Sequence, residues 1–242
     1  MLNGHGWRYI LTDDGSATIL MLPGSNPTVE SNWFGIGRFL PDYRVLSLRY
    51  PPAESSDALF EGIIAILGTG RIGRMHILGE SMESTIIYRF NRKHPERVYT
   101  LILLSLGMPD DATAKELGKV AFTLSFFPWS MLRRIFMKEA AKLASVFPEE
   151  EAAFMATFFM DQYDNDKRKI IGNLRLVAGI AEKVSALGLD RPFTGPNPVL
   201  IINSADDQSI DAEARDALVA TYPNVGTHLC PDDRHAMFRL RE

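Results

Sequence analysis

Short apolar runs alternate with longer amphipathic stretches along this chain, and this alternation limits the possible folds more than any other feature. Strand-like runs occupy residues 43–50, 75–79 and 99–107, and apolar residues at helical spacing fill 57–68 and 82–94 between them. Strands that alternate with helices form right-handed crossovers and a largely parallel sheet covered on both faces. The sequence therefore predicts an α/β fold with a mostly parallel sheet flanked by helices.

The N-terminal part shows a different local pattern. Residues 7–12 and 17–22 are strand-like, and the turn-rich tetrapeptide 13–16, "DDGS", joins them. Two strands separated by such a turn predict a β-hairpin. Residues 32–40 are expected to form a short helix before the alternating pattern begins.

The alternation is interrupted once, by a long block with helical periodicity alone. Residues 108–195 contain no convincing strand, whereas 198–204 and 226–230 are strand-like again. A chain of 242 residues is long enough for one large α/β domain. We therefore expect one α/β core, formed by residues 1–107 and 196–242, with residues 108–195 inserted as a helical cap.

Composition excludes several classes of protein. Lys and Arg number 26 against 30 Asp and Glu, a net charge of −4, so no global positive field attracts nucleic acid. Cys230 is the one cysteine, which excludes an intrachain disulfide and cysteine-rich metal sites. The N-terminus lacks a signal-peptide pattern, and no apolar run reaches the roughly 20 residues that span a bilayer. These features predict a cytoplasmic protein.

Three polar loops follow predicted strands, where parallel sheets carry their functional sites. Ser81 follows the strand at 75–79, Asp206 and Asp207 follow the next-to-last strand, and His235 follows the last one. A serine hydroxyl becomes a nucleophile when a base removes its proton, and an imidazole does this best when a carboxylate orients it. The order serine, acid, histidine is the order found in α/β-hydrolases.

The chain resembles an α/β-hydrolase over nearly its whole length. Residues 76–105 resemble the segment with the nucleophile elbow, 198–224 the acid loop, 232–238 the histidine loop and 21–31 the oxyanion loop. Within this superfamily, residues 206–224 and the aromatic and basic stretch 126–136 resemble the maspardin-like branch.

The resemblance implies a role for each matching residue. It implies Ser81 as the nucleophile, His235 as the general base, and Asp207, with Asp206 as the alternative, as the orienting acid. It places the oxyanion hole at the backbone N–H groups of Met82 and Ser25, and it implies no metal and no organic cofactor. Asp110 or Asp111, after the strand at 99–107, is an open alternative for a displaced acid.

The expected activity is hydrolysis of a carboxylic ester or thioester with an apolar acyl group. Nine phenylalanines lie in the helical block; some of them are expected in the core of the cap itself, and the remainder predict an apolar pocket over Ser81. They are Phe122, Phe126, Phe127, Phe136, Phe147, Phe154, Phe158, Phe159 and Phe193. A catalytically weak binding scaffold and a lyase or acyltransferase with the same triad are the alternatives. The aromatics beside Arg133 and Arg134 also predict contact of the cap with a membrane surface or a protein partner, and a homodimer is a further possibility.

Glu83 departs from the elbow pattern, because small residues normally stand two positions before and after the serine. Gly79 fits that pattern and Glu83 does not. A carboxylate in the first turn of a helix interacts favourably with the positive end of the helix dipole. We expect Glu83 to lie on the solvent-facing surface of that helix; the alternative is a carboxylate directed toward the site that changes its electrostatics.

Overall fold

The computed structural model describes most of the chain, with gaps near the N-terminus, in the helical block and at the C-terminus. The described residues are 6–13, 15–22, 36–37, 39–40, 42–51, 53, 55–144, 152–153, 156–157, 167–207 and 209–231. In these ranges, every helix is too short or too polar to traverse a lipid bilayer.

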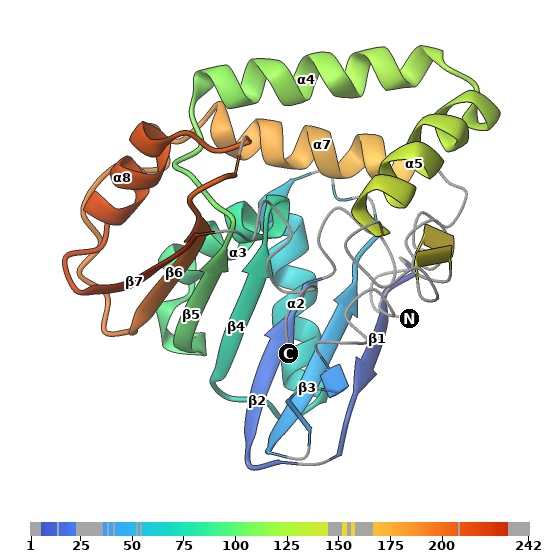
Figure 1. Cartoon of the computed structure of the whole chain (residues 1–242). Helices are drawn as coiled ribbons and strands as arrows, with labels where there is room; N and C mark the ends of the chain where they lie inside the picture. Colours follow the sequence, from blue (N-terminus) through green and yellow to red (C-terminus); the bar gives the residue numbers. More distant parts are fainter. Residues whose placement is uncertain are drawn as a thin grey trace.

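A seven-stranded sheet forms the centre of the molecule (Figure 1). Its spatial order is β1-β3-β2-β4-β5-β6-β7, and every neighbouring pair is parallel except β1 with β3. The predicted mostly parallel sheet is thus confirmed. The strands are β1 (Arg8–Leu11), β2 (Ala17–Met21), β3 (Tyr43–Arg49), β4 (Met75–Glu80), β5 (Val98–Leu104), β6 (Val199–Ser204) and β7 (Val225–Cys230).

The predicted N-terminal hairpin is wrong. β1 pairs antiparallel with β3, and β2 pairs parallel with β3 on its other side, so β3 separates the two strands expected to pair. Gly15, in the connection from β1 to β2, lies directly against the start of β3. Its φ is +87°, and a Cβ there would lie 2.4 Å from the backbone carbonyl carbon of Tyr43. Only glycine combines this backbone conformation with so close an approach.

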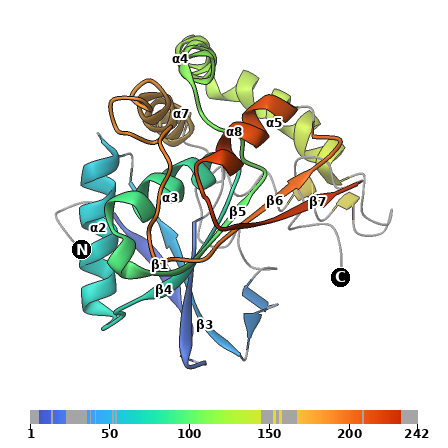
Figure 2. The same cartoon turned by 90° about the vertical axis from the view of Figure 1, so that its left-hand side faces the viewer.

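Two helices pack on one face of the sheet, α2 (Ser56–Thr69) and α3 (Met82–Lys93) (Figures 1 and 2). Their apolar side chains join those of the central strands in the main hydrophobic core, where Phe60 and Phe90 make an edge-to-face contact. The short 3₁₀ helix η2 (Pro95–Arg97) leads from α3 to β5, and α8 (Ala212–Ala220) lies between β6 and β7 in the chain. This arrangement places the first turn of α3 directly after the end of β4.

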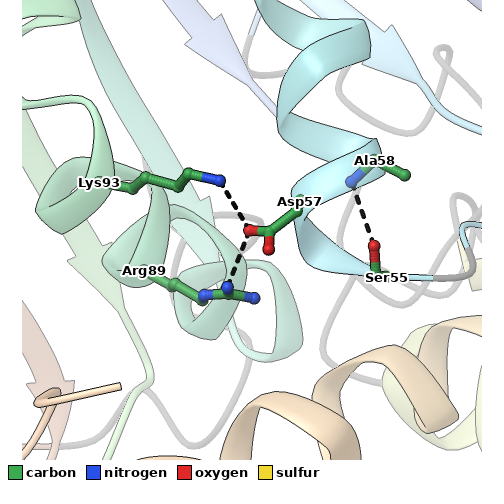
Figure 3. Close-up of polar contacts among 5 residues, drawn as sticks. All are labelled: Ser55, Asp57, Ala58, Arg89 and Lys93. Atoms are coloured by element: carbon green, nitrogen blue, oxygen red, sulfur yellow. Dashed lines mark hydrogen bonds and ion pairs between the residues drawn. The ribbon is translucent and has the colours of Figure 1, made fainter.

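A polar contact on the surface joins α2 to α3 (Figure 3). Asp57 Oδ1 accepts hydrogen bonds from Lys93 Nζ and Arg89 Nη2, each at 2.8 Å. The Lys93 hydrogen bond is the main reason that the pKa of Asp57 lies below its usual value. One residue before α2, Ser55 Oγ accepts from the N–H of Ala58 and caps the helix.

The part of residues 108–195 that the structure describes contains three long helices. They are α4 (Asp111–Phe126), α5 (Trp129–Ala144) and α7 (Lys167–Ala181). α4 packs along α7, and α7 in turn contacts α3, so these helices lie beyond the sheet on the side where α3 begins (Figures 1 and 2). Residues 108–195 remain our predicted boundaries for the cap.

Candidate active site

Ser81 occupies a sharp turn between β4 and α3. Its backbone has φ 58° and ψ −124°, a conformation that costs a non-glycine residue about 1–3 kcal/mol and persists where the surroundings impose it. The Ser81 N–H donates to the carbonyl of Leu104 at 2.9 Å and so ties the turn to the end of β5. The backbone therefore has the strand–turn–helix form of a nucleophile elbow.

Two neighbours hold this turn in place. A Cβ on Gly79 would lie 2.6 Å from Ile87 Cδ1 and 3.1 Å from the backbone carbonyl carbon of Glu83, so the expected need for a small residue there is met. The buried Ser84 Oγ hydrogen-bonds the carbonyls of Gly79 at 2.6 Å and Leu104 at 2.9 Å. Sequence reasoning missed Ser84, since a serine in a helix seldom indicates that its hydroxyl reaches back to the preceding strand.

Glu83 does not lie on the helix surface, and that expectation is wrong. Its side chain has 0% exposure, and Oε1 accepts a hydrogen bond from the hydroxyl of Tyr50 at 3.2 Å. The cause is helical periodicity, because residues 83, 87 and 90 share the face of α3 that packs on the core. The carboxylate is accommodated there by the Tyr50 donor and by the positive end of the α3 dipole.

Tyr50 is held as a neutral phenol. Burial, and then the negative charge of Glu83 and its hydrogen bond, raise the pKa of Tyr50 well above its usual value of 10.0. The hydroxyl therefore donates to Glu83 over the whole physiological pH range. Sequence reasoning missed this residue because its partner lies 33 positions away.

A cavity of about 420 Å³ opens beside Ser81. Its wall comes from the start of α3, the loop after β5, the first turns of α4, one residue of α7 and the loop into α8. The lining residues are Ser81, Met82, Thr85, Ser105, Leu106, Gly107, Met108, Pro109, Asp110, Ala112, Thr113, Glu116, Leu117, Val177, Ser209, Ile210, Asp211 and Ala214. Met82, the first residue of α3, also lines the cavity, and the first N–H groups of a helix have no partner inside that helix.

The loop after β5 supplies a second strained serine. Ser105 has φ 49°, is buried, and donates its N–H to the carbonyl of Ile202. The Asn203 side chain forms two hydrogen bonds to the backbone of Leu106. It accepts from the Leu106 N–H at 3.0 Å and donates to the Leu106 carbonyl at 3.2 Å. The described residues contain three non-glycine residues with positive φ, and two of them, Ser81 and Ser105, line this cavity.

The predicted acid loop reaches the same cavity. Asp207 is 6% exposed and accepts from the N–H of Ser209, a cavity residue, at 2.8 Å. Asp206 is exposed and accepts from the hydroxyl of Ser204. His235 and Ser25 lie outside the described residues, so their predicted roles stay predictions.

The charged residues in the described lining of the cavity are all acidic. Asp110 begins α4 and accepts from the N–H and hydroxyl of Thr113, both at 2.7 Å; these hydrogen bonds, the backbone one first, lower the pKa of Asp110. Asp211 caps α8 through the N–H of Ala214, and Glu116 is an exposed residue of α4. Within the described ranges, no three His, Cys, Asp or Glu side chains are placed to hold a metal ion.

The expectation that phenylalanines of the helical block line the pocket over Ser81 is wrong for the described ones. Phe122 and Phe126 point outward at 63% and 70% exposure, because they lie on a different side of α4 from the buried Ala121. Phe136 packs against an apolar cluster of α4 and α7, and Phe193 packs against the main core. Phe127 is absent from the described lining. Phe147, Phe154, Phe158 and Phe159 lie outside the described residues.

Comparison with known proteins places this geometry in a structural class. No protein-family model matches the chain. The 2-hydroxy-6-oxononadienedioate/2-hydroxy-6-oxononatrienedioate hydrolase 2 of Pseudomonas putida is 23% identical over an alignment of 240 positions, which covers 89% of this chain and 80% of the relative.

Solved structures are similar to the chain over a larger share of its length. A hydrolase from Pseudomonas aeruginosa has a TM-score of 0.73 at 18% identity, covering 97% of this chain and 89% of that one. The enol-lactonase of Burkholderia xenovorans has a TM-score of 0.69 at 18% identity, covering 94% and 88%. The chain therefore has the α/β-hydrolase fold. The maspardin-like resemblance stays a prediction.

Proposed function

We propose that the protein is a serine hydrolase that cleaves a carboxylic ester or thioester through Ser81. The observation that carries this proposal is the backbone of Ser81, which is held at φ 58° on the wall of a cavity. Strain of this kind is maintained where the surroundings impose it, and it is frequent at functional sites. The hydrolases of the same fold with similar sequence or structure support the reaction class.

In the proposed reaction, Ser81 Oγ attacks the substrate carbonyl while His235 accepts the hydroxyl proton. The oxyanion is stabilised by the N–H groups of Met82 and Ser25. Collapse breaks the bond to the alcohol or thiol, which leaves with the proton from His235. Water, deprotonated by His235, then hydrolyses the acyl-enzyme and restores the Ser81 hydroxyl.

Asp207 is the proposed partner of His235. Its burial, in contrast to the exposure of Asp206, supports this choice because an orienting carboxylate acts most strongly where water is excluded. Asp110 is already engaged as the cap of α4, which argues against it as a displaced acid. Replacing Asp207 by Asn should reduce kcat/KM far more than replacing Asp206 by Asn.

The acyl group is proposed to be uncharged. Asp110, Glu116 and Asp211 line the cavity, and its described wall offers no Lys, Arg or His to bind a substrate carboxylate. A second negative charge at about 4 Å costs about 1 kcal/mol even at the dielectric constant of water. The relative from Pseudomonas putida is named for a dioate, so the substrate proposed here differs from the one in that name.

Substrate charge is tested with two esters of one alcohol, butanoate and hemisuccinate. The neutral ester should have a kcat/KM higher by about fivefold or more, since about 1 kcal/mol of repulsion corresponds to a factor of about five. Glu116→Gln should reduce the ratio of kcat/KM for the butanoate ester to kcat/KM for the hemisuccinate. The control Glu182→Gln, outside this cavity, should leave that ratio unchanged. A preference for the hemisuccinate would contradict the uncharged acyl group.

The nucleophile itself is tested by labelling with a fluorophosphonate probe. The wild type should be labelled, and Ser81→Ala should not. Ser105→Ala is the matched control, because Ser105 is also strained and lines the same cavity; this variant should keep its label. Labelling of Ser81→Ala at the wild-type rate would rule out Ser81 as the nucleophile.

The alternative, a catalytically weak binding scaffold, is based on the maspardin-like resemblance and on the large Glu83 side chain two positions after Ser81. Glu83 is buried beneath the turn, and Ser81 keeps its strained backbone beside it. The size of Glu83 therefore does not argue against a catalytic Ser81. A scaffold would show no labelling at Ser81 and no turnover of any ester, so the experiment above separates the two functions.

A further inference from the structure

The outer face of α4 combines basic and aromatic side chains in one stripe. Lys115, Lys119, Phe122 and Phe126 follow each other at intervals of four, three and four residues, so they lie along one side of the helix. All four are exposed, and the rings of Phe122 and Phe126 contact each other with centroids 4.8 Å apart. This stripe lies on a different side of α4 from the buried Ala121.

The next helix continues the pattern. Met131 and Ile135 of α5 are 46% and 48% exposed and lie one turn apart. Arg133, Arg134 and Lys138 are also exposed and flank them. α4 and α5 meet at a corner at the edge of the molecule (Figure 1). We call these exposed residues of α4 and α5 the cap-corner patch.

The charge of this region is opposite to that of the whole protein. Between residues 115 and 138 the sequence holds five basic residues and one acidic residue, Glu116, whereas the full chain has a net charge of −4. A negatively charged partner attracts this basic region and repels the rest of the protein, so it turns the region toward itself. The partner of the patch should therefore be anionic and should accept apolar side chains.

We infer that the cap-corner patch docks the protein on an anionic lipid surface. Exposed phenylalanines with flanking lysines and arginines are the combination that interfacial helices use, since the rings enter the acyl boundary while the cations contact the headgroups. A second copy of this chain fits less well. A symmetric dimer through this patch would bring the same basic side chains together.

The shape of the region supports a lipid surface over an acidic protein. The exposed apolar residues belong to α4 and α5, two helices at the edge of the molecule (Figure 1), and a fluid interface accepts such side chains without a complementary groove. Binding would hold the cap against the bilayer while the rest of the chain, which is net acidic, is repelled from it. The inference does not depend on catalysis, because none of the patch residues named above lines the cavity at Ser81.

The test is co-sedimentation of the full chain with vesicles of phosphatidylcholine alone and with vesicles that also contain about 30% phosphatidylserine, an anionic lipid. The wild type should bind the anionic vesicles at least about tenfold more tightly than the neutral ones. Phe122→Ser/Phe126→Ser and Arg133→Gln/Arg134→Gln should each weaken that binding about tenfold or more.

The matched control is Arg8→Gln/Tyr9→Ser, which removes an exposed basic residue and an exposed aromatic ring from the edge strand β1. This variant should bind vesicles like the wild type. Circular dichroism checks that every variant is folded, which is expected because all the changed side chains are exposed.

Three results would overturn the inference. They are no binding to anionic vesicles, equal binding of the wild type and Phe122→Ser/Phe126→Ser, and a wild-type dimer in light scattering that the same double variant converts to a monomer. The last result would assign the patch to a second copy. Capture of an acidic protein through the patch, with no vesicle binding, would assign it to a protein partner.

Discussion

The turn at Ser81 and the cap-corner patch are opposites in how they place polar and apolar side chains. At the elbow, the chain buries Glu83 and Ser84 completely and gives each a hydrogen bond. At the cap corner, it exposes Phe122 and Phe126 to solvent at 63% and 70%. Each region departs from the usual distribution of residues between core and surface.

The difference shows what each departure accomplishes. Buried polar groups with hydrogen bonds fix one backbone conformation, because any other arrangement leaves them without partners. Exposed aromatic rings contribute little to the folded monomer and are available to another surface. The elbow is therefore suited to hold a reacting group in place, and the cap corner is suited to binding.

Adding one methyl group at the elbow should have the largest effect on stability. Gly79→Ala would place a Cβ 2.6 Å from Ile87 Cδ1 and 3.1 Å from the α3 backbone, and such overpacking costs about 1–3 kcal/mol. Gly118→Ala in α4 is the control, since a Cβ there meets no atom within 4 Å. It should stabilise the protein by about 0.5–1 kcal/mol. Urea denaturation measures both, and equal effects would show that the elbow is not tightly packed.

Removal of the Tyr50 hydroxyl is the next test of the buried region. Tyr50→Phe keeps the ring but takes a hydrogen-bond donor from the fully buried Glu83. Loss of one partner of a buried polar group costs about 1–3 kcal/mol. Tyr9→Phe, at an exposed tyrosine, is the control and should change the free energy of unfolding little. An unchanged free energy of unfolding in Tyr50→Phe would mean that the Glu83 carboxylate does not need this donor.

The contact between Tyr50 and Glu83 also predicts that the free energy of unfolding depends on pH in the alkaline range. The pKa of Tyr50 is raised in the folded state above its usual 10.0, so the folded protein holds a proton that the unfolded chain releases. This stabilising contribution is complete below about pH 10 and is lost as the pH rises through the raised pKa. The free energy of unfolding should therefore fall more steeply above pH 10 in the wild type than in Tyr50→Phe.

The helix cap at the mouth of the cavity should contribute a smaller amount. Asp110→Ala removes the acceptor of the Thr113 N–H, and loss of such a cap costs about 0.5–2 kcal/mol. Because the pKa of Asp110 is lowered in the folded state, its contribution is present above the usual value of 3.8 and disappears as the pH falls through the lowered pKa. At pH 2, wild type and Asp110→Ala should be more alike in stability than at pH 7.

The smallest effect is expected at the cap corner. Phe122→Ser should change the free energy of unfolding by no more than about 0.5 kcal/mol, because the side chain is 63% exposed. A loss of several kcal/mol would show that this ring belongs to the core of the cap. In that case the contrast between the two regions would disappear.

Local periodicity predicted most of the fold. The strands β3 to β7 and the helices between them lie where apolar runs and helical spacing indicated, since these signals act over a few residues. The hairpin prediction was wrong because strand pairing is not local: β3, which comes about 20 residues later, inserts between β1 and β2. A turn sequence alone cannot exclude such an insertion.

The site was less predictable from sequence than the fold. The order of residues indicated Ser81 and the acid loop, but the burial of Glu83 was missed, although its spacing to Ile87 places both on one helix face. The acidic lining of the cavity was also missed. It arises where the caps of α4 and α8 converge from residues 110 and 211, and no local pattern records that convergence.

The central claim is that the strained Ser81 forms a covalent acyl-enzyme. The most direct measurement is mass spectrometry of the protein quenched with acid during turnover of a butanoate ester. We predict one butanoyl group per chain, located on the peptide that contains Ser81 and absent from Ser81→Ala. Turnover of the ester with the butanoyl group on another residue, or with an equal yield of adduct in Ser81→Ala, would contradict the claim.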